Sequence, residues 1–373
     1  MKVAIVHDYL TQYGGAERVL QVLCELFPKA PIYTLIYNEK ATGGVFKGKE
    51  IITSFLQKVP GSKRFFRSLP FLMPLAIEQF DLSYYDLVIS NSTSYAKGII
   101  TKPKTIHISY CPTPSRYLWH DTHESVTEFK FPRITRPFIP WFLSYLRIWD
   151  LDASQRVDEF IAASKITQNR IKRYYNREST VIYPSIEIDK FNVSDKPKQY
   201  FLMVGRMVPY KRFDLVVDVF SDPKYGMQNE KLLIVGDGPE RKKLDAMVRK
   251  TNCKNIEFLG LISDQRLPEY YTNAKALIFP QEEDFGIVAL ESMACGRPVI
   301  AYKAGGALET IINGKTGIFF DEQNPESLSR ALSDFKDKSF NPQEIRQHAT
   351  NWDKKIFKDK IIDFIKSKTD IQI

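Results

Sequence analysis

The sequence has few cysteines, and they do not form the patterns that bind metals or build disulfide frameworks. Its 373 residues include four cysteines, and no two of them form a C-x-x-C pair. A disulfide-stapled secreted domain and a cysteine-based metal site are therefore disfavoured. A reduced, cytoplasmic setting is expected.

Long apolar runs are also missing. The apolar start, Met1–Val6, runs directly into polar His7 and Asp8 and is too short for a secretory signal peptide. No stretch approaches the roughly 18 apolar residues of a membrane span. Any contact with a membrane is expected to be peripheral, at the inner face of the plasma membrane.

The composition is that of an ordinary globular protein, with 43% hydrophobic and 26% charged residues. The length predicts two domains. A net charge of +9 suits a polyanionic partner or an anionic membrane surface, although most basic proteins of this size are simply soluble. No feature indicates a nucleic-acid partner.

The amino-terminal half alternates apolar strands with helical stretches, which predicts a parallel sheet. The first strand is followed by Gly14 and Gly15 and then by a helix beginning near Ala16. Two glycines let the backbone approach a ligand, and the helix offers free N–H groups. A plain turn explains the two glycines equally well. The strands predicted here are 2–6, 32–36, 87–90, 105–109 and 160–164.

The carboxyl-terminal half places glycines and cations after its strands. The strand 200–204 is followed by Gly205, Arg206 and Lys211. Arginine provides a planar fork and lysine a compact charge, which together can neutralise a departing diphosphate. In isolation this pattern is more often a solvated basic loop. Two further predicted strands, 231–235 and 256–260, lead into Gly236 and into Leu261 and Ile262.

Three carboxylates follow the next strand, 276–279. They precede a helix predicted from Phe285 to Ala294, which contains Glu291. Open α/β sheets bind ligands at the carboxyl ends of their strands, and a helix amino terminus attracts anions. A diphosphate is the expected ligand. A solvated acidic loop before an amphipathic helix is the alternative. The three carboxylates are Glu282, Glu283 and Asp284.

Glu283-x7-Glu291, followed by Cys295-Gly-Arg-Pro and Gly305-Gly306, resembles the signature of the family 4 (group 1) retaining glycosyltransferases. The resemblance implies an α/β, GT-B fold, in which two Rossmann-like domains face one another across a cleft. The expected domains are an acceptor-side domain, 1–185, joined by a tail helix in 352–373 that crosses back, and a nucleotide-sugar domain, 198–351.

The resemblance further implies transfer of a hexose with retention of configuration, without a cofactor or an essential metal and without a protein nucleophile. Arg206 and Lys211 would stabilise the leaving diphosphate. Glu283 would hold hydroxyls of the sugar, and Glu291 would hold the ribose. Further donor-binding residues would be Gly14, Gly15, Gly236, Leu261, Ile262, Phe285, Gly286 and Ile287.

One position departs from the family pattern. Relatives often carry a histidine directly after the cysteine that corresponds to Cys111, and this chain has Pro112 there. His120, which follows in the same segment, is the candidate for part of that catalytic role. A packing or surface histidine is the common alternative.

The segment from Tyr110 to Tyr117, together with Gly14-Gly-Ala-Glu-Arg18, looks most like bacterial mannosyltransferases of surface-polysaccharide synthesis, lipopolysaccharide included. The resemblance therefore implies transfer of mannose from GDP-mannose to a lipid-linked or saccharide acceptor. The alternatives are a non-catalytic nucleotide-sugar-binding subunit and another GT-B enzyme, such as a sugar-nucleotide epimerase.

Two segments, 63–73 and 129–149, are both basic and aromatic, which suits an anionic membrane surface. Trp141, Tyr145 and Trp149 recur every four residues, so a helix stripe packed on the core is an equal alternative. Asp150 and Asp152 form a D-x-D within a continuous predicted helix. They are interpreted as structural rather than metal-binding.

Overall fold

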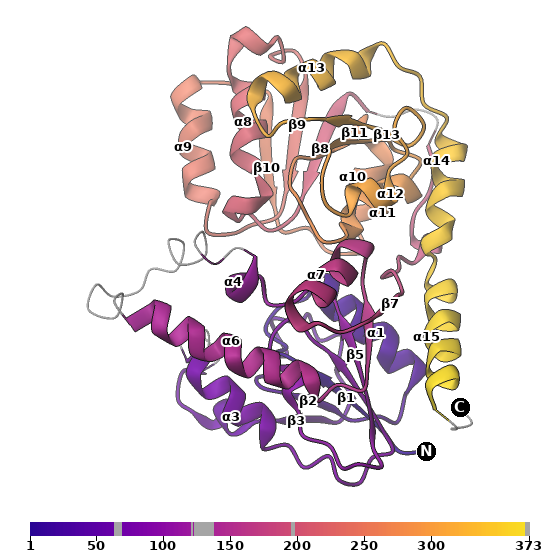
Figure 1. Ribbon diagram of the computed structural model, residues 1–373. Coiled ribbons are helices and arrows are strands. Elements are labelled where there is room, and N and C mark those ends of the chain that lie inside the picture. Colours follow the sequence, from indigo (N-terminus) through magenta and orange to yellow (C-terminus); the bar gives the residue numbers. More distant parts are fainter. Residues whose placement is uncertain (63–68, 121, 123–137, 195–197, 370–373) are drawn as a thin grey trace. The chain divides into compact units, whose positions relative to one another are not determined.

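The computed structural model describes residues 1–62, 69–120, 122, 138–194 and 198–369. The chain forms two compact units (Figure 1). The first contains Met1–Tyr183 and Phe357–Ile373, and the second contains Pro184–Ile356. The second unit therefore includes residues 184 and 185, expected in the first domain, and the described part of the expected linker, 186–194. Of the tail expected at 352–373, the part from Phe357 on belongs to the first unit.

The first unit is built on a parallel sheet. Across the described residues the sheet has seven strands, in the order β3-β2-β1-β4-β5-β6-β7. Short apolar runs form these strands because helices cover both faces of the sheet. The strands are β1 (Val3–His7), β2 (Ile32–Thr34), β3 (Ile51–Thr53), β4 (Leu87–Asn91), β5 (Ile106–Cys111), β6 (Glu159–Ala162) and β7 (Thr180–Val181).

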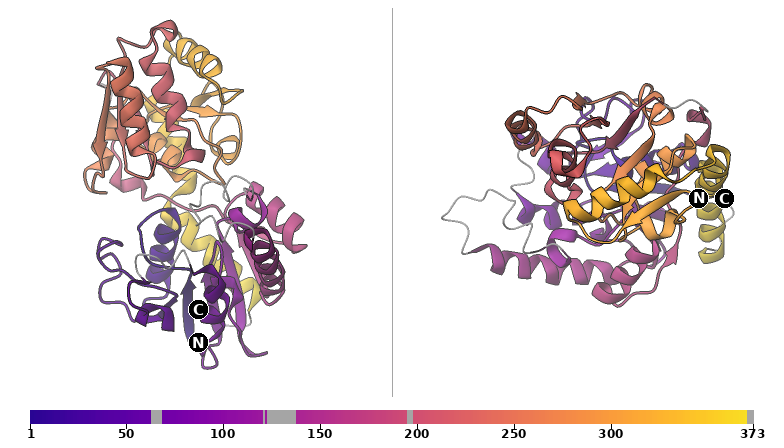
Figure 2. Two further views of the ribbon diagram at one scale, coloured as in Figure 1. Left: turned by 90° about the vertical axis from the view of Figure 1, so that its left-hand side faces the viewer. Right: turned by 90° about the horizontal axis from the view of Figure 1, so that it is seen from above.

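Each face of this sheet has its own hydrophobic core. On one face, α1 packs with the carboxyl-terminal helix α15, whose Phe357, Ile361 and Phe364 join the same cluster as Ile5. Figure 2 shows α15 beside the first unit. The helical elements are α1 (Gly15–Leu26), η1 (Phe55–Lys58), η3 (Pro70–Leu72), α3 (Met73–Glu78), η4 (Ala96–Gly98), α4 (Arg116–Trp119), α6 (Ile139–Gln155), α7 (Lys165–Tyr175) and α15 (Lys354–Lys368).

The second unit contains another parallel sheet, six-stranded in the described residues, with the order β10-β9-β8-β11-β12-β13. Its strands are β8 (Tyr200–Val204), β9 (Lys231–Val235), β10 (Ile256–Gly260), β11 (Ala276–Phe279), β12 (Val299–Tyr302) and β13 (Gly317–Phe320). Its helical elements are η6 (Ile188–Lys190), η7 (Pro209–Lys211), α8 (Phe213–Ser221), η8 (Pro223–Tyr225), α9 (Arg241–Thr251), α10 (Leu267–Asn273), α11 (Ile287–Ala294), α12 (Ala307–Thr310), α13 (Pro325–Lys336), α14 (Pro342–Ala349) and η9 (Thr350–Trp352).

The strand order of each sheet reverses at one point. In the second unit the chain builds outward from β8 through β9 and β10, and then returns to place β11 on the other side of β8. In the first unit the same reversal lies between β1 and β4. Ligands of doubly wound sheets bind at such switch points, beyond the carboxyl ends of the strands. The prediction of two α/β, Rossmann-like domains is confirmed.

Candidate functional site

An ion pair lies at the switch point of the second unit. Lys211 ends η7, which follows β8, and Glu283 lies in the loop after β11. Their Nζ and Oε1 atoms are 2.7 Å apart, and both side chains are mostly buried, at 14% and 17% exposed. Gln281, itself buried, donates from Nε2 to the same carboxylate oxygen at 3.3 Å. A cation and a hydrogen-bond acceptor are therefore held together where a ligand of this fold binds.

Two glycines hold the acidic loop against its neighbours. Gly306 donates its N–H to the carbonyl oxygen of Glu283 at 2.7 Å. A Cβ on Gly306 would lie 2.4 Å from Cα of Phe285, so no larger residue fits. Gly305 has φ +65°, and a Cβ there would lie 2.4 Å from the same Glu283 carbonyl oxygen. The Gly-Gly pair of the sequence signature therefore fixes the backbone position of Glu283.

The helix after this loop begins later than predicted. Gly286, in the left-handed conformation, is the residue before α11, and Ile287 is the first helical residue, so Phe285 lies outside the helix. Glu291, the expected ribose ligand, is 3% exposed, and its Oε2 accepts a hydrogen bond from Tyr271 of α10 at 2.8 Å. The structure thus gives Glu291 a packing partner that sequence spacing did not reveal.

The other residues expected to bind the donor follow neighbouring strands of the same sheet. Arg206 is exposed in the turn after β8, while Leu261 (82% exposed) and Ile262 follow β10. Gly236, after β9, is buried with φ +130°, and a Cβ there would lie 1.9 Å from the carbonyl oxygen of Gly205. Gly236 therefore lets the loops after β8 and β9 pack together.

In the first unit, the Gly14-Gly15 turn leads from β1 into α1. The N–H of Gly14 donates to Glu17 Oε2 at 2.8 Å, and Glu17 Oε1 lies 3.6 Å from His7 Nε2. Gly15 is the first residue of α1 and is exposed. The Gly14 amide therefore donates within its own turn, and the N–H of Gly15 remains the one expected to meet a ligand.

A second carboxylate, Asp8, organises the switch point of the first unit, and the sequence analysis missed it. It is buried and accepts the backbone N–H groups of Thr93, Ser94, Tyr95 and Ala96 at 2.6–2.9 Å. These residues follow β4, so Asp8 fixes the loop beyond that strand. The available signal in the sequence was that Asp8 is polar and directly follows the buried strand β1.

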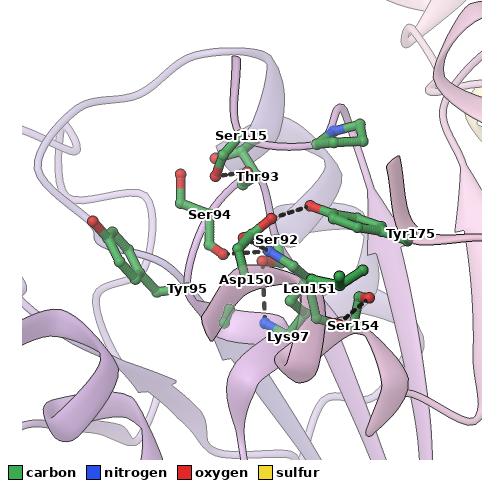
Figure 3. A network of polar contacts seen from close by, with 12 residues as sticks. Ser92, Thr93, Ser94, Tyr95, Lys97, Ser115, Asp150, Leu151, Ser154 and Tyr175 are labelled. Carbon is green, nitrogen blue, oxygen red and sulfur yellow. Dashed lines mark hydrogen bonds and ion pairs between the residues drawn. The ribbon is translucent and has the colours of Figure 1, made fainter. Parts of the chain in front are cut away.

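His120 follows α4 and is exposed. Its helix is held by Trp119, whose indole N–H donates to Asp150 Oδ2 at 2.8 Å. Asp150 also pairs with Lys97 at 2.5 Å and accepts a hydrogen bond from Tyr175 at 2.8 Å (Figure 3). Asp150 is therefore the structural residue that the D-x-D interpretation expected. Lys97 was not recognised from the sequence.

The described residues contain no group of three or more His, Cys, Asp or Glu side chains placed to hold a metal ion. Within the same part of the chain, no helix is long and apolar enough to cross a membrane. Lys63–Arg67 and Phe129–Arg133, the basic stretches of the two segments proposed for membrane contact, lie outside the described residues. Trp141 and Tyr145 are exposed, and Trp149 is half-buried.

Residues 184–352 match the family model described as Glycosyl transferases group 1. This region is similar to the group 1 glycosyltransferases. It contains the Lys211–Glu283 pair and both glycines that hold the acidic loop.

Curated relatives match only part of the chain. An uncharacterised glycosyltransferase of Methanocaldococcus jannaschii is 30% identical over 197 residues, which are 52% of this chain and 53% of that protein. The GDP-mannose-dependent alpha-(1-6)-phosphatidylinositol monomannoside mannosyltransferase of Mycolicibacterium smegmatis is 29% identical over 155 residues, 39% of this chain and 40% of that protein. The match thus spans about half the length of these relatives, or less.

Solved structures match both units of the chain. Anabaena HepE in complex with UDP has a TM-score of 0.72 at 18% identity, covering 98% of this chain and 100% of that chain. WaaG, a glycosyltransferase involved in lipopolysaccharide biosynthesis, has a TM-score of 0.68 at 17% identity, covering 97% of this chain and 99% of that chain. These similarities show the GT-B fold.

Proposed function

We propose that the protein transfers a hexose from a nucleotide-sugar, with GDP-mannose as the donor, to a lipid-linked or saccharide acceptor, and retains the anomeric configuration. The Lys211–Glu283 pair at the switch point of the second unit carries this proposal. The name of the Mycolicibacterium relative supports GDP-mannose. The acceptor class is supported by the resemblance to mannosyltransferases of polysaccharide synthesis.

The two residues of the pair would bind different parts of the donor. A bound donor places a diphosphate and a sugar beside each other, so Lys211 would turn to the diphosphate while the Glu283 carboxylate accepts hydrogen bonds from sugar hydroxyls. Arg206 would add a second cation as negative charge develops on the leaving phosphate. The amides at the start of α11 would face the same charge. We propose no metal and no protein nucleophile in this step.

Thermal stabilisation by UDP-, GDP- and ADP-sugars tests the donor, because a ligand that binds the folded state raises its stability. GDP-mannose is expected to give the largest shift, and a larger shift with a UDP-sugar would overturn the choice of nucleotide. Release of nucleoside diphosphate in the presence of acceptor then separates the transferase from a pure nucleotide-sugar binder, which releases none.

Arg206→Ala and a chelator test the chemistry. We expect Arg206→Ala to lower turnover by about 10²-fold, because the leaving group loses one of the two cations proposed to stabilise it. Excess chelator should leave the wild-type rate unchanged. Inhibition by chelator that manganese reverses would contradict the metal-free step.

A further inference from the structure

Gln281 is a buried glutamine in the acidic loop that contains Glu283. The strand β11 ends at Phe279, so Gln281 lies just beyond the carboxyl end of an interior strand of the second sheet. The residue is 3% exposed, and its Nε2 atom donates to Glu283 Oε1 at 3.3 Å. Burial of an amide is unfavourable unless the amide is hydrogen-bonded, so its contact with the carboxylate helps to hold this side chain in place.

The Glu283 carboxylate has a charged donor and a neutral one, and the two differ in how far they can move. Lys211 Nζ, at the end of a flexible four-carbon stem, lies 2.7 Å from Oε1. Gln281 donates to the same oxygen from two residues away in the same loop. Lys211 can therefore turn to a ligand while Gln281 stays beside Glu283. Both contacts are to Oε1, so Oε2 is the oxygen that neither residue covers.

Backbone contacts fix the acidic loop but leave the carboxylate of Glu283 to its side-chain donors. Gly306 donates its N–H to the carbonyl oxygen of Glu283 at 2.7 Å. Gln323 donates from Nε2 to the carbonyl oxygen of Pro280, also at 2.7 Å. Neither bond restrains the side-chain torsions of Glu283. The direction of its carboxylate therefore depends on the bonds that Oε1 accepts.

Donor binding, as proposed above, removes one of these two restraints. Lys211 would turn to the diphosphate, which leaves Gln281 to keep Oε1 in place. Because the amide is neutral, the carboxylate retains its negative charge for the hydroxyls of the sugar. The 3.3 Å bond is long for an N–H donor and has room to shorten once Nζ moves away. Hydrogen bonds at reacting sites often tighten in this way when the ligand binds.

We propose that Gln281 is a positioning residue that directs the Glu283 carboxylate toward the sugar of the bound donor. This inference rests on the proposed function, in which Glu283 accepts hydrogen bonds from sugar hydroxyls. Gln281 acts through Glu283 alone. It therefore strengthens binding of the sugar part of the donor and does not affect binding of the nucleotide part.

Calorimetric titration of the full-length protein with GDP-mannose and with GDP tests this role. Gln281→Met keeps the length of the side chain but removes its amide. We expect this variant to bind GDP-mannose about tenfold more weakly, because a hydrogen bond to a charged group is lost. Binding of GDP, which lacks the sugar, should not change, and it also shows that the variant is folded. Gln281→Asn, which keeps an amide but shortens its reach, should show the same selective loss.

Two comparisons distinguish positioning of the carboxylate from a general loosening of the loop. In a Glu283→Ala background, Gln281→Met should change the affinity for GDP-mannose by less than about twofold, since its partner is already absent. Gln323→Met makes the same substitution at a glutamine that binds the backbone of this loop. It should keep the wild-type ratio of the affinities for GDP-mannose and GDP.

The outcomes separate this inference from the proposed function. If Gln281→Met keeps the wild-type ratio of affinities while Glu283→Ala lowers it, Gln281 has no positioning role and the proposed function stands. An equal fall of the ratio in Gln323→Met, or an undiminished effect of Gln281→Met in the Glu283→Ala background, would make Gln281 a structural residue of the loop. If the wild type does not bind GDP-mannose, or Glu283→Ala keeps the wild-type ratio, the proposed donor or the role of Glu283 is overturned, and this inference with it.

Discussion

Removal of one partner from the buried Lys97–Asp150 pair should destabilise the first unit strongly. The two side chains are 2% and 1% exposed, so water cannot replace the lost partner. Lys97→Met leaves the Asp150 carboxylate with only the neutral donors Trp119 and Tyr175. Breaking a buried pair in this way costs about 3–5 kcal/mol of unfolding free energy. For a domain of this size the midpoint of thermal unfolding should fall by roughly 6–20 °C.

Asp150→Asn should cost a similar amount, because Lys97 then keeps its charge without a counter-charge. The double variant removes both charges, and its amide oxygen can still accept from Trp119 and Tyr175. Its loss of stability should therefore be smaller than the sum of the two single losses, by about 1–3 kcal/mol. This coupling energy is the quantity that reports the ion pair itself.

Urea unfolding followed by tryptophan fluorescence gives the free energy of unfolding of the wild type, the two single variants and the double variant. Trp119, Trp141 and Trp149 lie in the first unit and Trp352 in the second, so the signal reports mainly the first unit. Additive single effects, or a loss below about 1 kcal/mol for Lys97→Met, would refute the interpretation that this pair is a buried and energetically coupled contact.

Three further predictions concern the second unit and a buried histidine. Lys211→Ala should lower the rate of nucleoside diphosphate release by about 10²–10³-fold in protein that remains folded, because the leaving group loses a cation; a normal rate would remove Lys211 from the mechanism. Gly306→Ala should abolish stabilisation by donor, because its Cβ would lie 2.4 Å from Cα of Phe285 and displace the acidic loop; unchanged donor affinity would show that this loop does not contact the donor. Burial lowers the pKa of His107 from 6.5 to about 3, so the unfolded chain binds a proton that the folded chain does not. The free energy of unfolding should therefore fall as the pH drops from 6.5 towards 3, by up to about 1.4 kcal/mol per pH unit, and His107→Gln should lack this part of the fall in urea titrations.

The fold was largely predictable because strands buried on both faces are short continuous apolar runs. The predicted strands 200–204 and 231–235 match β8 and β9 residue for residue. The strands β3 and β7 were missed. They are three and two residues long, and pairing with a neighbouring strand defines them more than composition does.

The candidate site was predictable only where its residues follow strands of one sheet. Lys211 and Glu283 each follow a recognisable strand, but their contact depends on β8 and β11 being neighbours, which no local pattern shows. Lys97 and Asp150 are 53 residues apart and carry no local signal of their pairing. The four-residue spacing of Trp141, Tyr145 and Trp149 could not decide between a core and a surface position, because Asp150 sets the rotation of α6.

The most direct test of the central proposal is transfer of labelled mannose from GDP-mannose to a membrane lipid fraction by the purified protein. The wild type is expected to label the lipid. Glu283→Gln, which keeps the shape but removes the charge opposite Lys211, is expected to label it at least about 10²-fold more slowly under conditions in which both proteins are folded. Equal labelling by the two proteins would contradict the role of Glu283 in transfer, and no labelling by the wild type would contradict GDP-mannose transfer to lipid.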